Sequence, residues 1–236
     1  MQTHSCLLLY LLGVFLFGLP ACADAPEKTS SANEPEVTAP QTPDSGSEDR
    51  VIVFFGNSLS AGYGLETEES FPARIQQRLD SLGYPYRVVN AGVSGETSSG
   101  GTGRIDWVLR QPIDIFVLEL GGNDGLRGIP PEQTQANLQE IIDAVQATHP
   151  EAEIILAGMQ IPPNMGTEYT EKFRKIFPAL AEANDSVVLL PFLLQGVGGV
   201  PALNQPDGIH PTAEGAKIVA ENVWEVMEPL LEKGDG

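Results

Sequence analysis

Five short runs of apolar residues recur along residues 51–190, and each is followed by glycine, asparagine or proline. Side chains in these runs are apolar at consecutive positions rather than at alternate ones. That pattern is typical of parallel strands that are covered on both faces of a sheet. We therefore predict five buried parallel strands, at Val51–Phe55, Tyr86–Val89, Asp114–Leu120, Glu153–Ala157 and Ser186–Leu190.

Amphipathic helical patterns separate these runs. Apolar residues at helical spacing predict four long helices, at Pro72–Leu82, Glu132–Thr148, Glu168–Ala183 and Thr212–Leu231. Ser70 is a suitable N-cap for the first helix, and Pro178 is expected to kink or restart the third. Strands that alternate with helices indicate an open, doubly wound α/β domain with right-handed crossovers.

The charge of the chain restricts its partners. Its 236 residues hold 13 Lys and Arg against 32 Asp and Glu, a formal net charge of −19. A surface this acidic repels phosphate backbones and anionic lipid headgroups, so nucleic-acid binding is not expected. The acidity is compatible with a high-salt habitat, or simply with solubility.

Cysteine and histidine are scarce. Both cysteines, Cys6 and Cys22, precede residue 23, so residues 51–236 have no disulfide and no thiolate metal ligand. The three histidines are His4, His149 and His210. A zinc site would have to consist mostly of carboxylates, which is uncommon. We therefore expect no metal.

The N-terminal residues have the features of a leader and a linker. Residues 6–19 form an uncharged apolar run of the length of a signal-peptide core, too short for a comfortable membrane span. We assign residues 1–23 as a signal peptide. Residues 24–50 are rich in Pro, Ser, Thr and acids, contain no aromatic residue, and are expected to form a disordered tether.

Two processing routes remain open for this leader. Leu19-Pro20-Ala21-Cys22 resembles a bacterial lipobox, in which Cys22 would be lipidated, although Pro20 departs from the usual pattern. Alternatively, Ala21-Cys22-Ala23 is a small-x-small site for ordinary signal peptidase. The first route predicts a lipid-anchored protein of the bacterial cell envelope, periplasmic or in the outer membrane, and the second a secreted protein.

Residues with catalytic chemistry follow the predicted strands. Ser58 follows the first strand, Gly92 the second and Asn123 the third, while Asp207 and His210 precede the last helix. The carboxyl ends of parallel strands meet at one edge, where ligands of open sheets bind. A hydroxyl, amide donors and an Asp-x-x-His turn are the set that acyl transfer requires.

Each of these residues alone has a structural interpretation. Ser58 could be a helix N-cap, Gly92 a turn residue, and Asn123 a turn or cap residue. Asp207 could cap its local turn, and His210 could simply precede the last helix. Their coincidence at one sheet edge favours the catalytic interpretation. Neither a Gly-x-Ser-x-Gly nucleophile elbow nor a phosphate-binding P-loop is present.

Four segments resemble the signature blocks of the SGNH (GDSL) hydrolases: FFGNSLSAGYGL, NAGVSGET, ELGGNDGLRG and PDGIHP. They occur in family order and spacing, and the resemblance covers Val51 to Leu231. It is strongest to the bacterial multifunctional thioesterase, lysophospholipase and arylesterase group. The resemblance implies that residues 51–236 form a flavodoxin-like three-layer α/β/α sandwich with a five-stranded parallel sheet, without metal or organic cofactor.

The resemblance also implies the role of each site residue. Ser58 would be the nucleophile, His210 the base and Asp207 the group that orients the imidazole. The oxyanion hole would comprise the backbone N–H groups of Ser58 and Gly92 and the side-chain amide of Asn123. In the family's Gly-Asp-Ser-Leu the aspartate is Asn57 here, a departure expected to affect rate or pH profile rather than the type of reaction.

The expected function is hydrolysis of small carboxylic esters or thioesters, including acyl, lysophospholipid and aryl esters, through an acyl-enzyme by a monomeric protein. Two alternatives stay open: a polysaccharide O-acetyl esterase, and a catalytically inactive binding module on a lipoprotein tether. Loops at Gly64–Leu65, Leu126 and Pro162–Tyr169 are expected to shape the acyl pocket.

Overall fold

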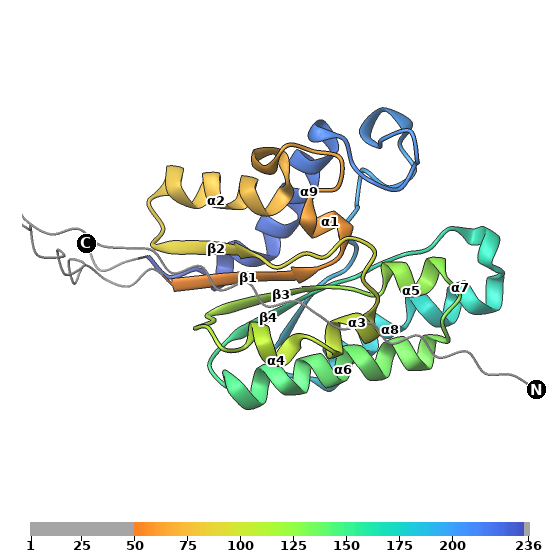
Figure 1. Cartoon of the computed structure of the whole chain (residues 1–236), viewed down its shortest axis with the longest axis horizontal. Coiled ribbons are helices and arrows are strands. Elements are labelled where there is room, and N and C mark those ends of the chain that lie inside the picture. The colour runs from red at the N-terminus through yellow and green to blue at the C-terminus, as the bar shows by residue number, and fades with distance from the viewer. Residues whose placement is uncertain (1–49, 234–236) are drawn as a thin grey trace, which may run out of the picture. The chain divides into compact units, whose positions relative to one another are not determined.

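A computed structural model of the chain describes residues 50–233. The predicted signal peptide, Cys22 and all but the last residue of the predicted tether lie outside the described residues. Within them, one five-stranded parallel sheet has the order β2-β1-β3-β4-β5 (Figure 1). The strands are β1 (Arg50–Gly56), β2 (Tyr86–Asn90), β3 (Ile115–Glu119), β4 (Glu153–Ala157) and β5 (Val187–Leu190). All five predicted strands are confirmed, with ends that differ by at most one residue.

The three central strands form the core of the sheet. Every residue of β3 is buried, as are all but the first residue of β1 and of β4. The edge strands β2 and β5 are only partly buried. Continuous apolar runs therefore reflect burial on both faces, as predicted.

Helices cover both faces of the sheet (Figure 1). In that view α2 and α9 lie above the sheet, and α3, α4, α6 and α8 lie below it. The fold is thus a three-layer α/β/α sandwich. The helices are α1 (Ser58–Ala61), α2 (Phe71–Leu82), α3 (Ser98–Thr102), α4 (Ile105–Val108), α5 (Gly122–Leu126), α6 (Pro131–Thr148), α7 (Thr167–Arg174), α8 (Ile176–Ala183) and α9 (Ala213–Met227). Short 3₁₀ turns are η1 (Thr67–Glu69), η2 (Pro163–Met165), η3 (Pro201–Leu203) and η4 (Glu228–Leu230).

Local signals account for the ends of the long helices. The Ser70 side chain accepts a hydrogen bond from the backbone N–H of Ala73, so this residue is the predicted N-cap of α2. The predicted third helix is divided into α7 and α8 at Lys175, three residues before Pro178, because proline lacks an N–H and its ring crowds the preceding turn. The last helix ends at Met227 and continues as the turn η4 rather than as an α-helix.

The short helices α1, α3, α4 and α5 were not predicted. Each has only four or five residues, too few for a periodic apolar stripe. Glycine-rich α3 forms because the Thr97 side chain caps it and because Gly101 lies against the core. A Cβ atom at Gly101 would overlap the side chain of Leu120. Tertiary packing therefore overrides weak helix propensity here.

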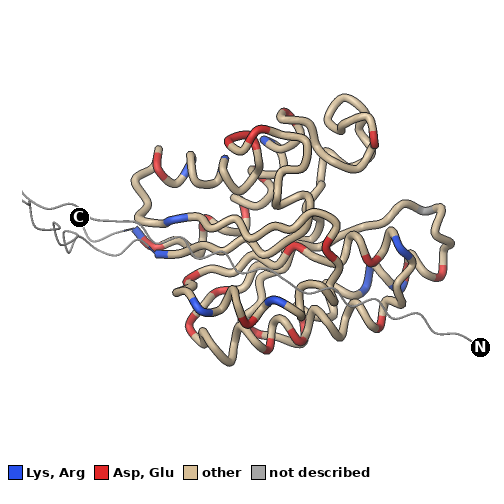
Figure 2. The backbone as a smooth tube through the Cα atoms, in the orientation of Figure 1, with Lys and Arg blue, Asp and Glu red and all other residues tan. Residues whose placement is uncertain are grey.

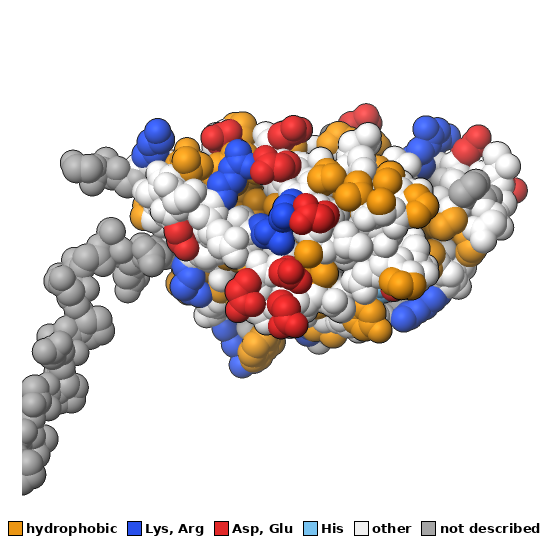
Figure 3. Space-filling view, turned by 90° about the horizontal axis from the view of Figure 1, so that it is seen from above, with side chains coloured by type: hydrophobic (Ala, Val, Ile, Leu, Met, Phe, Trp, Pro, Cys, Tyr) orange, Lys and Arg blue, Asp and Glu red, His pale blue; other side chains and the backbone are white. Residues whose placement is uncertain are grey.

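Positions with Lys, Arg, Asp or Glu are spread along the backbone of both helical layers (Figure 2). Seen from above, the face over α2 and α9 has acidic and basic side chains next to one another, with hydrophobic side chains more frequent toward the right of the view (Figure 3). Among the helices of residues 50–233, none is both long and apolar enough for a membrane span.

Candidate active site

A tight turn connects β1 to α1, and we call residues 56–60 the nucleophile turn. Asn57 is the N-cap of α1, since its side-chain oxygen accepts the backbone N–H of Leu59 at 3.0 Å. Ser58 is therefore the first helical residue and not the cap, which excludes the structural interpretation of this serine. Its hydroxyl is left to contact other residues.

The hydroxyl of Ser58 contacts the imidazole of His210, although 152 residues separate them in the sequence. Oγ of Ser58 and Nε2 of His210 are 2.8 Å apart. On the other side of the ring, Nδ1 lies 2.7 Å from Oδ2 of Asp207. The structure thus brings the three predicted residues into one hydrogen-bonded series, in which the carboxylate fixes the tautomer and the orientation of the ring.

Asp207 belongs to the segment before α9, and we call residues 204–211 the base loop. Its Oδ1 accepts the backbone N–H groups of Ile209 and His210, at 2.9 and 3.0 Å. The hydrogen bond from the His210 ring, together with these backbone bonds, lowers the pKa of Asp207 to about 2. One carboxylate therefore both closes its own turn and contacts the ring of His210, so its structural interpretation is confirmed and its catalytic role stays a prediction.

The base loop is also held at its ends. Asn204 and Pro211 form an antiparallel bridge, and the backbone N–H of Gln205 donates to the carbonyl of His210 at 2.7 Å. The ring of Tyr63 lies against that of His210, with 4.6 Å between ring centroids. Tyr63 and Gln205 were not predicted as site residues, because nothing in their sequence spacing marks them.

The predicted oxyanion donors lie close to the nucleophile turn. The N–H of Ser58 is at the first position of α1, where backbone N–H groups have no partner within the helix. Gly92 packs on α1 so closely that a Cβ atom would overlap the backbone of Ala61 and of Asn57. A Cβ atom on Gly122, beside Asn123, would lie 3.9 Å from Nδ2 of Asn57.

Two of these donors already have protein partners. The N–H of Gly92 donates to Oδ1 of Asn90 at 3.0 Å. Nδ2 of Asn123 donates to the carbonyl of Glu96 at 2.9 Å, and its second hydrogen stays available. Gly92 therefore has to share its N–H with Asn90, or release it, before it can donate to an oxyanion.

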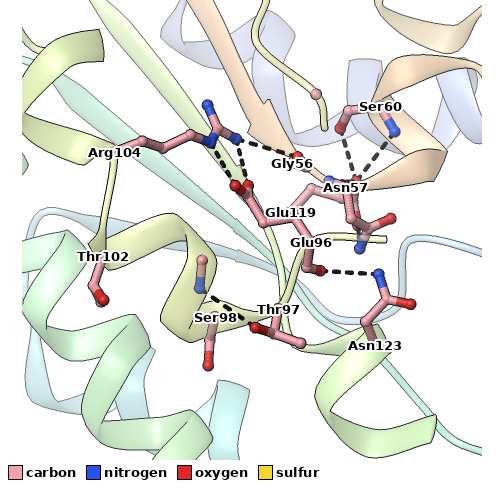
Figure 4. A network of polar contacts seen from close by, with 12 residues as sticks. Gly56, Asn57, Ser60, Glu96, Thr97, Ser98, Thr102, Arg104, Glu119 and Asn123 are labelled. Atoms are coloured by element: carbon pink, nitrogen blue, oxygen red, sulfur yellow. Dashed lines mark hydrogen bonds and ion pairs between the residues drawn. The ribbon is translucent and has the colours of Figure 1, made fainter. Parts of the chain in front are cut away.

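Buried polar residues support the site from beneath, and the sequence interpretation missed them. The carboxylate of Glu119, at the end of β3, accepts hydrogen bonds from Asn57 and Ser60 (Figure 4). The carboxylate of Asp124 accepts the backbone N–H and hydroxyl of Ser98. Both acids are fully buried. Two features of the sequence could have indicated these acids. Glu119 lies within an apolar run predicted as a buried strand, and Asp124 directly follows Asn123.

A further ion pair connects the loops. Arg104 forms two hydrogen bonds with the carboxylate of Glu96, and its guanidinium lies 3.9 Å from the centroid of the Phe55 ring. Nη2 of Arg104 also donates to the carbonyl of Gly56 at 3.4 Å. The loop that carries Glu96, and with it the side chain of Asn123, is thereby tied to the nucleophile turn (Figure 4).

An apolar groove of about 390 Å³ opens beside these residues. Its wall includes Leu59 next to Ser58 and Ile209 next to His210, together with Leu126, Met159, Ile161 and Phe192. This volume is in the range of small-molecule sites. A chain with one polar, reactive end could place that end at Ser58 and its apolar part along the groove.

The loop predictions for this pocket were partly correct. Leu126 and Pro162 line the groove, and Leu65 lines a narrower crevice that also touches Ser58 and His210. Tyr169 instead lines a different depression, where its hydroxyl donates to the carbonyl of Ile129. The sequence interpretation missed the segment from Phe192 to Gly199, which forms one wall of the groove.

Within residues 50–233, no cluster of three His, Cys, Asp or Glu side chains could hold a metal ion. His149 lies at the end of α6, where its Nε2 is 3.0 Å from the carbonyl of Leu109. It takes no part in the site.

The fold and this series of contacts define a class, the α/β/α hydrolases with serine, histidine and aspartate at the carboxyl edge of the sheet. Comparison with known proteins agrees. The model of the GDSL-like lipase/acylhydrolase family matches residues 54–218. Since the match covers more than half of the sequence, the chain belongs to this family.

Similar proteins include the esterase TesA of Pseudomonas aeruginosa, 44% identical over 77% of this chain and 90% of that protein. The thioesterase 1/protease 1/lysophospholipase L1 of Escherichia coli K12 is 39% identical over 76% of this chain and 84% of its own length. The psychrotrophic esterase EstA from a Pseudoalteromonas species, solved in a form inhibited by monoethylphosphonate, is 32% identical with a TM-score of 0.71, over 77% of this chain and 98% of EstA. The chain is a hydrolase like these relatives.

Proposed function

We propose that this protein hydrolyses carboxylic esters and thioesters with apolar acyl or aryl groups, through an acyl-enzyme on Ser58. The hydrogen-bonded series Ser58–His210–Asp207 is the observation that carries the proposal. The esterase and thioesterase relatives support the choice of bond that is cleaved.

The geometry supports a two-step mechanism. Oγ of Ser58 attacks the acyl carbonyl while Nε2 of His210 takes its proton, and the same proton then goes to the departing alkoxide or thiolate. A water molecule, deprotonated by His210, hydrolyses the acyl-serine and restores the hydroxyl. Asp207 stays ionised throughout, because its lowered pKa keeps it charged well below neutral pH. The negative oxygen of each tetrahedral intermediate would be held by Ser58, Gly92 and Asn123.

The groove favours apolar substrates over carbohydrate. A polysaccharide O-acetyl esterase needs polar groups for the sugar hydroxyls, whereas the groove wall is mostly aliphatic and aromatic. Several large apolar side chains also remain exposed around the site: Tyr63 (54%), Val93 (45%), Ile209 (44%) and Leu126 (40%). We therefore assign acyl chains or aryl groups to the groove and rank the carbohydrate ester second.

A burst experiment separates this function from an inactive binding module. Mixed with excess p-nitrophenyl ester, the wild type should release one equivalent of nitrophenol quickly and then turn over more slowly, because the activated leaving group makes acylation faster than hydrolysis of the acyl-enzyme. Ser58→Ala should lower kcat by at least about 10⁴-fold without loss of thermal stability, since no core cavity is created. Full hydrolysis by folded Ser58→Ala would refute the proposal.

A series of nitrophenyl and acyl-CoA esters of increasing chain length would define the substrate. We expect kcat/KM to rise with acyl length until the groove is filled and then to level off. A preference for acetyl, with no gain from longer chains, would favour the O-acetyl esterase alternative.

We further propose that Cys22 carries a lipid anchor that places the enzyme at the bacterial envelope. The apolar run, the cysteine and the acidic tether support this assignment. Labelled fatty acid should enter the full-length protein, and Cys22→Ser should release it to the soluble fraction. A mature N-terminus at Asp24 would instead indicate ordinary secretion.

A further inference from the structure

Glu119 is a buried carboxylate that the mechanism above does not use. It ends β3, has no exposed surface, and faces the nucleophile turn. Its Oε2 accepts the backbone N–H of Asn57 at 3.0 Å, the backbone N–H of Ser60 at 3.1 Å and the hydroxyl of Ser60 at 2.8 Å. Its Oε1 accepts Nδ2 of Asn57 at 2.6 Å. One carboxylate thus holds the residues on both sides of Ser58 (Figure 4).

The glycine of the nucleophile turn is explained by the same carboxylate. A Cβ atom on Gly56 would lie 2.5 Å from Oε2 of Glu119 and would overlap the hydroxyl of Ser60. The turn is therefore built around the acid, and not merely next to it.

The orientation of Asn57 follows from the chemistry of Glu119. An ionised carboxylate only accepts hydrogen bonds, so Asn57 must present its amide nitrogen to Glu119. The amide oxygen is then directed to the N–H of Leu59, which it caps, and to Oγ of Ser58 at 3.3 Å. The charge on Glu119 thereby decides which end of the amide faces the nucleophile.

We propose that Glu119, in its ionised form, is the positioning residue of the nucleophile turn, and that Asn57 transmits this state to Ser58. The inference rests on the proposed role of Ser58 as the nucleophile. Protonation of Glu119 adds an O–H that only an acceptor can satisfy. The Asn57 amide then turns its oxygen toward Glu119, and the cap on Leu59 and the contact with Ser58 are lost.

The titration of Glu119 places this change near neutral pH. Burial raises the pKa of Glu119 to about 7, although the hydrogen bonds from Ser60 and Asn57 act in the opposite direction. Charged groups on the surrounding elements are already partnered: Arg104 with Glu96, Asp124 with Ser98, and His210 with Asp207. We therefore expect the ionisation of Glu119 to contribute to the rise of kcat with pH.

Asn57 stands where family members usually have aspartate, and its substitution by aspartate gives a second test of the role of Glu119. Asn57→Asp would place two carboxylates against each other, and such a pair holds one shared proton. With that proton the aspartic acid donates to Glu119 as Nδ2 of Asn57 does. We therefore expect Asn57→Asp to stay active at neutral pH and to lose activity at alkaline pH, where the shared proton leaves.

Moving the negative charge from residue 119 to residue 57 tests the proposal. Glu119→Gln imitates the protonated acid, because one of its two polar ends becomes a donor. Asn57→Asp with Glu119→Gln restores every hydrogen bond, since the aspartate accepts from the new amide and still caps Leu59. The single variant Glu119→Gln should lower kcat by about 10- to 100-fold, with KM little changed and a flatter pH dependence near neutrality. The double variant should have a kcat at least about tenfold higher than that of Glu119→Gln.

Asp114→Asn is the matched control. This acid precedes the other end of β3 and accepts the N–H of Val51 at 2.7 Å, far from the site along the strand. Its loss should reduce stability without changing kcat or the pH profile. Tm is measured for every variant, so that loss of fold is separated from loss of position.

Two results would overturn the inference: a folded Glu119→Gln with wild-type kcat and pH profile, or a folded double variant no faster than Glu119→Gln. Should Glu119→Gln fail to fold, Asn57→Asp decides, and the absence of an alkaline decline overturns the inference. Failure of the underlying function is recognised separately, by the activity of Ser58→Ala.

Discussion

The nucleophile turn and the base loop meet at one hydrogen bond but are held in opposite ways. Gly56, Asn57, Ser58 and Ser60 are buried, and their positions depend on Glu119 in the middle of the sheet. Residues 206–209 of the base loop are exposed, and Asp207 holds His210 by bonds within four residues. The core therefore positions Ser58, whereas a local turn positions His210. Changes that disturb the contacts of Glu119 with the turn should affect both stability and rate, and changes to Asp207 or His210 mainly the rate.

The largest expected effect tests the loop side of this comparison. His210→Ala removes the proposed base and should lower kcat by about 10⁴-fold or more, and Asp207→Ala by about 10²- to 10⁴-fold. Because both residues lie on the surface side, Tm should change by only a few degrees. Steady-state kinetics and calorimetry measure the two quantities. A large loss of Tm in either variant would show that the base loop is part of the folding core.

The pH dependence of stability tests the turn side. The pKa of Glu119 is raised, so the folded state binds more protons than the unfolded chain between pH 4.5 and about 7. The contribution of Glu119 to stability is therefore complete below pH 4.5 and is lost as pH rises through about 7. The raised pKa corresponds to a decrease of about 3 kcal/mol in the free energy of unfolding across this pH range. Urea unfolding across this range should show a decline that is weaker in Glu119→Gln, and equal slopes would contradict the raised pKa.

Ionisation of Glu119 should change kcat and the free energy of unfolding in opposite directions. Over the same pH range we expect kcat to rise while the free energy of unfolding falls, because the ionised form that positions Ser58 is also the form that burial disfavours. Parallel measurement of both on one preparation checks the opposition.

Gly56→Ala tests the crowding of the turn. The added methyl group would overlap the Ser60 hydroxyl and press on Glu119, and overpacking of this kind costs about 1 to 3 kcal/mol. Both Tm and kcat should fall together. A variant with reduced kcat at unchanged Tm would mean that the turn moves independently of the core.

Gly208→Ala is the corresponding change in the base loop, with the smallest expected effect. Gly208 has φ +70° and nothing within 4 Å of its Cβ position. The cost is that of a left-handed alanine, about 1 kcal/mol, without a clash. A loss of stability as large as that of Gly56→Ala would remove the contrast between the two regions.

The sequence predicted the sheet, the long helices and the three residues of the series because these features repeat or have fixed spacing. Alternation of buried strands with helices determines the topology, and the topology brings the strand ends together. Ser58 and His210 could be paired without knowledge of the distance between them. The catalytic roles of all the site residues stay predictions: Ser58, Gly92, Asn123, Asp207 and His210.

The supporting interactions could not be predicted in the same way. Glu119 stands in an apolar run, and only the register of β1 against β3, which pairs Gly56 with Glu119, reveals what it faces. The bond from Gly92 to Asn90 depends on a loop conformation that has no periodic signature. The division of α7 from α8 was foreseen from Pro178, but the short helices, whose formation depends on tertiary packing, were not.

The antiparallel bridge between Asn204 and Pro211 has a consequence for how the groove of this enzyme can vary. The segment before it, from Phe192 to Gly199, supplies a wall of the groove, while Asp207 and His210 lie between the two bridged residues. Residues 192–199 lie outside this bridge, whereas the hydrogen bonds that Asp207 accepts from Ile209 and His210 lie within it. Substitutions confined to residues 192–199 should therefore reshape one wall of the groove while the hydrogen bonds that hold the His210 imidazole stay in place.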